Sequence, residues 1–215
     1  AGVRKRYSAN WIDSVFLQRT DTRDRSLGLE LQAFDAKSFW LASFTRHFGE
    51  ATVVAPVTLK IDRGSLRYNR DLGGGLSFRG NFTWQTTHQR SLPSSELFFI
   101  GGDGSVRGYT VATYSGDRGR TLNLELHHPL GTWTPAGREL ATTGFLFLDR
   151  GEVAPFRPPN SSLPASERLT GYGWGLNASF DKRSQARLTF GFGHTEVPGA
   201  PRHYEVNFQF VASLF

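Results

Sequence analysis

Apolar and polar residues alternate with a period of two through most of the chain, which is the pattern of β-strands with two unlike faces. In residues 74–88, for example, Leu76, Phe78 and Phe82 share one face, and Ser77 and Arg79 lie on the other. Convincing helical periodicity is absent from the sequence. Ten alternating runs predict ten strands, at residues 7–19, 25–35, 38–48, 57–69, 74–88, 119–130, 140–151, 170–181, 185–195 and 203–215.

Two features of these runs indicate a membrane barrel. One face of the strands carries polar residues in mid-strand, among them Arg79, Glu125, Asn177 and Gln209, whereas the other face is apolar and aromatic. The connections also alternate, with short bends near 36, 71 and 183, a somewhat longer one at 131–139, and long ones near 100 and 160. Short turns at one rim and long loops at the other are typical of outer-membrane barrels. The pattern therefore predicts an all-β fold, an antiparallel transmembrane β-barrel, with a soluble barrel or sandwich as the alternative.

The amino-acid composition excludes some classes of function and disfavours others. The 215 residues include 25 Lys and Arg, 19 Asp and Glu, and no Cys or Met. Disulfides and thiol chemistry are therefore excluded. Only four of the basic residues are lysines, and the basic residues are scattered, which favours arginines lining a polar cavity over a nucleic-acid partner. Neither a transmembrane helix nor a signal peptide is expected, so we expect a processed or excised chain, or one that is not exported.

The connection at 89–118 is the most unusual segment of the chain. It begins with the apolar run Leu97 to Ile100 and then places glycines at 101, 102, 104 and 108 around Arg107. Long connections of this kind are usually functional or disordered, and glycines permit tight backbone reversals. We predict a folded-back loop that presents Arg107 at its tip.

Two motifs in this part of the chain resemble those of a known superfamily. Gly101-Gly102 followed by Ser105-Val106-Arg107-Gly108-Tyr109 resembles a signature of the outer-membrane polypeptide-transport barrels, which include the TpsB transporters and BamA. Phe147-Leu148-Asp149-Arg150-Gly151, two strands later, resembles their second signature. Leu97 to Gly102, Leu122 to Leu126 and Pro129-Leu130 resemble the TpsB branch.

This resemblance implies a fold and a function. It implies that residues 1–215 are the C-terminal part of a sixteen-strand barrel that follows periplasmic POTRA domains, and that loop 89–118 folds into the lumen. It also implies secretion of a TpsA-like partner protein across the bacterial outer membrane, by a monomer surrounded by outer-membrane lipid. The functional residues would be the loop motif Gly101, Gly102, Ser105, Val106, Arg107, Gly108 and Tyr109, and the partner motif Phe147, Asp149 and Gly151.

A pair between Arg107 and Asp149 is part of that implication, and the chemistry agrees with it. Aspartate is disfavoured in strands, and an arginine inside a confined lumen requires a carboxylate because an unpaired charge there is costly. We expect Phe145 and Phe147 to pack beneath the loop, and Tyr109 to pack on the lumen wall.

Other functions remain as alternatives. A BamA-like assembly barrel and a passive porin-like barrel share the expected architecture, but a porin has no role for the two motifs together. We expect no enzyme activity, because no Ser/His/Asp grouping stands out, and no metal or cofactor. Gly101-Gly102-Asp103-Gly104 lacks the Gly-Lys-Ser/Thr ending of a phosphate-binding loop. The chain ends in an aromatic strand, as outer-membrane barrels often do, although Phe215 does not share the face of Phe208 and Phe210.

Overall fold

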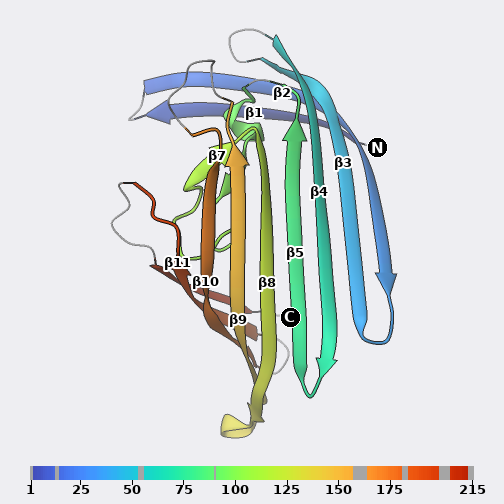
Figure 1. The fold of residues 1–215 in the computed structure, drawn as a ribbon, viewed down its shortest axis with the longest axis vertical. Helices are drawn as coiled ribbons and strands as arrows, with labels where there is room; N and C mark the ends of the chain where they lie inside the picture. The colour runs from blue at the N-terminus through green and yellow to red at the C-terminus, as the bar shows by residue number, and fades with distance from the viewer. Residues whose placement is uncertain are drawn as a thin grey trace.

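The main element of the fold is one antiparallel sheet of ten strands, shown in Figure 1. The computed structural model describes residues 2–12, 15–52, 56–89, 91–156, 164–180, 184–198 and 204–212. Each strand of the sheet pairs with its neighbour along the chain. The strands are β1 (Gly2–Ile12), β2 (Val15–Phe34), β3 (Ser38–Thr52), β4 (Pro56–Gly73), β5 (Leu76–Thr87), β8 (Arg118–Trp133), β9 (Leu140–Ala154), β10 (Glu167–Phe180), β11 (Ser184–Gly193) and β12 (Tyr204–Ala212).

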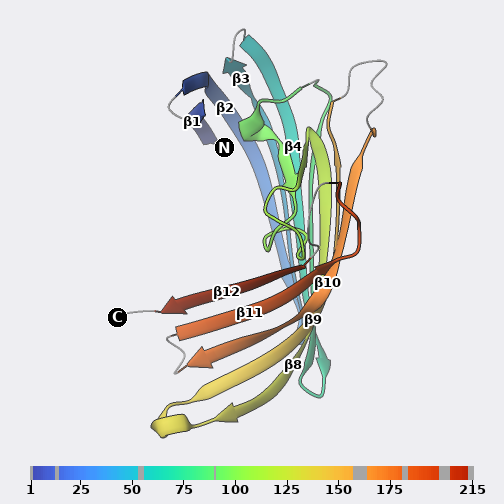
Figure 2. The same ribbon diagram turned by 90° about the vertical axis from the view of Figure 1, so that its left-hand side faces the viewer.

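The sheet curves strongly but does not close, because β1 and β12 are its two edges and do not pair with each other. Figure 2 shows the concave side and the segment between β5 and β8 lying within it. The prediction of an all-β antiparallel fold with about ten strands is confirmed. Of the described residues, none belongs to a helix long and apolar enough to cross a membrane.

Some predicted boundaries are wrong. The strand expected at 7–19 is instead parts of β1 and β2, which pair as a hairpin from Gly2 opposite Ser26 to Ile12 opposite Val15. Alternation continues on both sides of this reversal, so periodicity alone does not reveal it. The last strand ends at Ala212, and Phe215 lies outside the described residues.

The loop predicted at 89–118 also contains regular structure. It holds a short 3-10 helix, η1 (Ser94–Glu96), and two short strands, β6 (Phe98–Ile100) and β7 (Tyr114–Gly116), which pair as a ribbon. The apolar run before the glycines packs against the sheet through alternate residues, with Ile100 inaccessible and Phe99 46% exposed. The loop is thus a folded element rather than an irregular connection.

The two faces of the sheet follow the predicted alternation. On β9, Phe145, Phe147 and Asp149 are at most 5% exposed, whereas Leu146 and Leu148 are 62% and 50% exposed on the opposite, convex side. On β2 the convex face carries Leu27, Leu29 and Leu31, each at least 60% exposed. A convex apolar face and a concave polar face are the arrangement of a membrane barrel with an aqueous interior.

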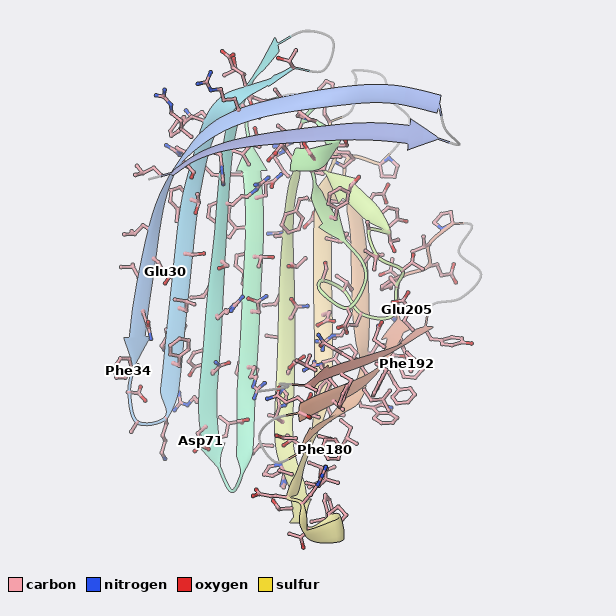
Figure 3. All side chains as sticks on the ribbon, turned by 180° about the vertical axis from the view of Figure 1, so that it is seen from behind. Glu30, Phe34, Asp71, Phe180, Phe192 and Glu205 are labelled. Carbon is pink, nitrogen blue, oxygen red and sulfur yellow. The ribbon has the colours of Figure 1, made fainter. Side chains whose placement is uncertain are left out.

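The two ends of the sheet differ in their connections. At one end, where Phe34, Asp71 and Phe180 are labelled in Figure 3, β2–β3 and β4–β5 are joined by short turns and β8–β9 by the 3-10 helix η2 (Pro135–Gly137). The Asp35 carboxylate accepts hydrogen bonds from the backbone N–H of Lys37 (2.7 Å) and of Ser38 (2.8 Å). These donors lower the pKa of Asp35 because they favour its ionised form. The long connections, including the loop between β5 and β8, lie at the other end, which in outer-membrane barrels is the extracellular end.

Candidate functional site in the loop on the concave face

The loop between β5 and β8 lies on the concave face over β8, β9 and β10 (Figure 2). Gly101, Gly102 and Gly108 have φ angles of 106°, 90° and 92°, which favour glycine. A Cβ at Gly101 would lie 2.6 Å from the carbonyl oxygen of Thr110, so this glycine lets the loop fold back on itself. Gly104 has no positive φ angle, and its conformation therefore does not require glycine.

The loop motif meets the partner motif at one buried ion pair, between Arg107 and Asp149. The Arg107 Nε and Nη2 atoms donate to the two Asp149 carboxylate oxygens at 2.7 and 2.8 Å, and the Arg107 backbone N–H donates at 3.0 Å. Arg107 is 3% exposed and Asp149 is inaccessible. We call this three-bond contact the Arg107 latch. It fixes both the side chain and the backbone of the loop at this point.

A second carboxylate completes the environment of Arg107. Glu125 on β8 accepts from Arg107 Nη1 at 2.5 Å and from Arg187 Nη2, on β11, at 2.8 Å. Its other oxygen lies 2.8 Å from His127 Nε2. The alternation of the strand predicts only that Glu125 lies on the polar wall. Glu125 shares its face of β8 with Asn123, and this shared face is the signal in the sequence that identifies Glu125 as a second partner of Arg107.

Aromatic rings support the two arginines from below. The Arg107 guanidinium lies 3.7 Å from the centre of the Phe147 ring, and that of Arg187 lies 4.2 Å from the Phe145 ring. Stacking of a guanidinium on an aromatic face stabilises the cation. Phe145 and Phe147 therefore pack beneath the loop, and they also contact its charged group and the neighbouring arginine directly.

Four glycines of the wall form a groove that holds the loop, two of them against its backbone and two against its side chains. A Cβ at Gly171 would overlap the carbonyl oxygen of Arg107, and one at Gly191 would lie 2.6 Å from the Gly108 nitrogen. A Cβ at Gly151 would lie 2.7 Å from Val106 Cγ2, and one at Gly193 would lie 2.6 Å from the Tyr109 ring. At Gly171 and Gly191 a side chain would meet the loop backbone itself, so a larger residue at either position would displace the loop. We call Gly151, Gly171, Gly191 and Gly193 the glycine groove.

The remaining motif residues fix the loop around the latch. Val106 is inaccessible within an apolar cluster that includes Ile100, Tyr109 and Leu169. The Tyr109 hydroxyl donates to the carbonyl oxygen of Thr170 at 2.8 Å and accepts from the Thr195 N–H at 2.7 Å. The carbonyl oxygen of Ser105 accepts from the Asn123 amide. The structure therefore brings Ser105 to Tyr109 of the loop motif together with the partner motif on the wall, whereas Gly101 and Gly102 shape the turn within the loop.

The loop has a second attachment, at its base, that the motifs do not include. The Arg63 Nη2 atom donates to Glu96 at 2.9 Å, and Arg63 Nε donates to Gln85 at 2.7 Å. Gln85 in turn donates to the carbonyl oxygens of Glu96 (2.8 Å) and Asp117 (3.1 Å). Gln85, Glu96 and Asp117 are each at most 5% exposed. We call these four residues the base anchor.

Asp117 joins the two arms of the loop. Its carboxylate accepts from the backbone N–H of Leu92, on the first arm, at 2.5 Å. It also accepts from the N–H of Phe156, just after β9, at 2.5 Å. Sequence reasoning missed this anchor because its residues are far apart in the chain and match no motif. The available signal was the polar alternation of β4 and β5, which places Arg63 and Gln85 on the concave face.

Beside the latch, the concave face is hollowed and polar. A cavity of about 410 Å³ is lined by residues that include Arg67, Arg79, Asn81, Glu125 and Arg187. A second cavity of about 380 Å³ lies next to it and shares Arg79 and Arg187. Polar side chains of β4, β5, β8, β10, β11 and β12 thus border two adjacent cavities along the sheet.

Comparison with known proteins gives one family and one fold. The profile of the haemolysin secretion/activation protein family ShlB/FhaC/HecB matches residues 5–178. No curated protein matches the chain. CdiB from Acinetobacter baumannii is 20% identical, with a TM-score of 0.73, over 95% of this chain and 36% of that one. CdiB from Escherichia coli is 16% identical, with a TM-score of 0.60, over 95% and 48%. The chain thus spans between a third and a half of the length of these solved structures.

Proposed function

Because the chain belongs to the ShlB/FhaC/HecB family of haemolysin secretion/activation proteins, we propose that its protein secretes a TpsA-like partner protein across the bacterial outer membrane. The family is that of the TpsB transporters of two-partner secretion, which are outer-membrane β-barrels. The observation that carries the proposal is the Arg107 latch, which fixes a folded loop on the polar concave face of the sheet.

The chain forms the C-terminal part of a sixteen-strand barrel that acts as a monomer. Residues 1–215 belong to one barrel domain, and residues 89–118 form its lumen loop. The apolar convex face contacts lipid, and the concave face lines the route of the secreted chain. Arg79, Asn81 and Asn177 border the cavities of that route and give an unfolded chain weak, reversible contacts.

The latch holds the loop in the conformation that transport needs. A plain diffusion porin would give no role to a buried pair that costs desolvation to form. Loss of Arg107 leaves Asp149 buried and without its main donor, which is more costly than the net contribution of the pair. The loop then leaves the glycine groove, and the route for the secreted chain changes.

Secretion by an Arg107→Ala variant tests the proposal. The amount of partner protein in the medium should fall, while barrel insertion, measured by heat-dependent mobility on electrophoresis, should be largely retained. Arg107→Lys should be intermediate, because an ammonium keeps the charge but cannot donate in the planar two-bond arrangement. Arg46→Ala is the matched control, since Arg46 pairs with Asp62 away from the loop. Normal secretion by Arg107→Ala would overturn the proposal.

A further inference from the structure

A second set of arginines lies on the opposite, convex face, away from the latch. Three charged residues are in register across neighbouring strands, with Arg120 on β8 opposite Glu152 on β9 and Glu152 opposite Arg168 on β10. Arg120 donates to Glu152 at 2.6 and 3.1 Å, and Arg168 donates at 3.1 and 3.2 Å. The two arginine side chains remain 65% and 59% exposed. Glu152 therefore holds two outward-facing guanidinium groups without neutralising both.

Two more arginines extend this group. Arg118 and Arg150 occupy even-numbered positions of β8 and β9, the positions whose side chains face outward, and both are exposed. Neither has a carboxylate partner among the residues that the structure describes. Four arginines therefore surround one glutamate, a local excess of positive charge. We call Arg118, Arg120, Arg150 and Arg168 the outer arginine cluster.

The cluster lies directly above apolar surface. In the row that contains Arg150, Leu122 lies opposite this arginine and Phe82 lies opposite Leu122. The two rows below that carry Leu124, Leu148 and Tyr172, and then Leu126, Leu146 and Trp174. An outward-facing apolar band with aromatic residues at its margin marks the part of a barrel that contacts lipid chains. The cluster therefore lies at the level of the lipid headgroups, at the end with the long loops.

A groove runs beside the cluster. It encloses about 500 Å³ and is lined by residues that include Trp84, Thr86, Arg118, Arg120 and Glu152. Trp84 lies opposite Arg120 in register and lines the groove, and its ring covers Gly64 on the side toward Phe44, so an apolar surface continues from the groove away from the guanidinium groups. One wall of the groove suits an apolar chain and the other suits an anion.

We propose that the outer arginine cluster binds the phosphorylated headgroup of an outer-leaflet glycolipid, with an acyl chain along the apolar rows below. Guanidinium groups match phosphate oxygens in a planar two-bond geometry, and basic pockets at membrane interfaces bind anionic headgroups. The headgroup, rather than free phosphate, fits because the arginines border lipid-facing surface. This inference rests on the outer-membrane location in the proposed function, but not on secretion or on the Arg107 latch.

Native mass spectrometry of the whole protein in detergent tests the proposal with lipid A as the probe. We expect saturable retention of lipid A, much less retention of its dephosphorylated form, and little competition from inorganic phosphate. Arg118→Gln/Arg120→Gln should weaken retention about tenfold to thirtyfold, the effect of two interfacial arginines. The control Arg67→Gln/Arg79→Gln removes the same charge from the concave face and should leave retention unchanged.

Glu152→Gln separates binding from folding. It removes a negative charge from the site, so lipid A should bind at least as tightly as to the unmodified protein. If Glu152 and the arginines served only to stabilise the fold, Glu152→Gln would instead reduce lipid A retention. Equal retention by Arg118→Gln/Arg120→Gln and the unmodified protein would overturn the proposal, as would equal loss in the concave-face control. Full competition by inorganic phosphate would assign the cluster to free anions instead. Secretion measured in the same variants tests the proposed transport function, and lipid A retention tests the binding site. The failure of one proposal can therefore be told from the failure of the other.

Discussion

The carbonyl oxygen of Arg107 occupies the space that a Cβ atom at Gly171 would need. Gly171 lies opposite Asp149 in register, so the wall glycine and the latch carboxylate define one seat for the loop. Gly171→Ala should therefore push Arg107 off Asp149. The cost expected for overpacking is about 1–3 kcal/mol, and secretion should fall, as is expected for Arg107→Ala.

The measurement for Gly171→Ala is amide hydrogen exchange across the loop, which reports local opening. Gly80→Ala on β5 is the matched control, because the nearest atom to a Cβ there is a Phe78 ring carbon at an ordinary 3.5 Å. Unchanged protection of the loop in Gly171→Ala would contradict a seat defined by this glycine.

The two carboxylates around Arg107 should contribute unequally. Asp149→Asn keeps the shape of the side chain but leaves a buried guanidinium with one carboxylate, which should cost about 3–5 kcal/mol of loop stability. Glu125→Gln should cost less, about 1–3 kcal/mol, because Arg107 keeps its three bonds to Asp149 and Glu125 is partly exposed. Hydrogen exchange of the loop amides ranks the two variants, and the reverse order would show that Glu125 holds the loop.

The base anchor should be coupled more strongly than a less buried pair of the same chemistry. A double-mutant cycle with Arg63→Met and Glu96→Gln should give a coupling energy of about 1–3 kcal/mol, within the range for residues in one network. The comparison cycle uses Arg46→Met and Asp62→Asn. The Asp62 side chain is 18% exposed and that of Glu96 is 4% exposed, so solvent screens the comparison pair more and its coupling should be smaller. Denaturation of the purified barrel measures both cycles, and equal couplings would count against a buried anchor.

A disulfide should replace the latch. The chain has no cysteine, and a Cβ at Gly151 would lie 2.7 Å from Val106 Cγ2, so Val106→Cys/Gly151→Cys places two thiols within bonding reach. In an Arg107→Ala background, oxidation should hold the loop in its seat and restore secretion, and reduction should abolish it again.

Phe98→Cys/Gly119→Cys is the matched control for that disulfide. Phe98 Cγ lies 2.8 Å from the position of a Cβ at Gly119, so this second bond ties the β6 ribbon to β8 without holding the loop motif. It should not rescue Arg107→Ala. If oxidised Val106→Cys/Gly151→Cys instead blocked secretion in the presence of Arg107, transport would require the loop to leave the groove.

Much of the fold was readable from the sequence because a two-residue period reports which side of a strand each side chain occupies. The opposite faces of Phe147 and Leu148 follow from that period alone. The reversal between β1 and β2 was missed, because alternation runs through both strands and does not register a change of direction.

The contact between Arg107 and Asp149 was also expected from sequence, because two motifs and the cost of an unpaired charge both indicate it. The roles of Glu125, Gly171 and Glu96 were decided only by the tertiary structure. Their positions depend on the register between strands and on how the loop folds onto them, and these relations join residues far apart in the chain. By itself, the sequence determined which side chains face inward and which charges require partners. The packing of the loop in the glycine groove decided which partners these charges have. A glycine that leaves room for the loop backbone does not alter the alternation of apolar and polar residues along its strand, so this packing cannot be recognised from the alternation.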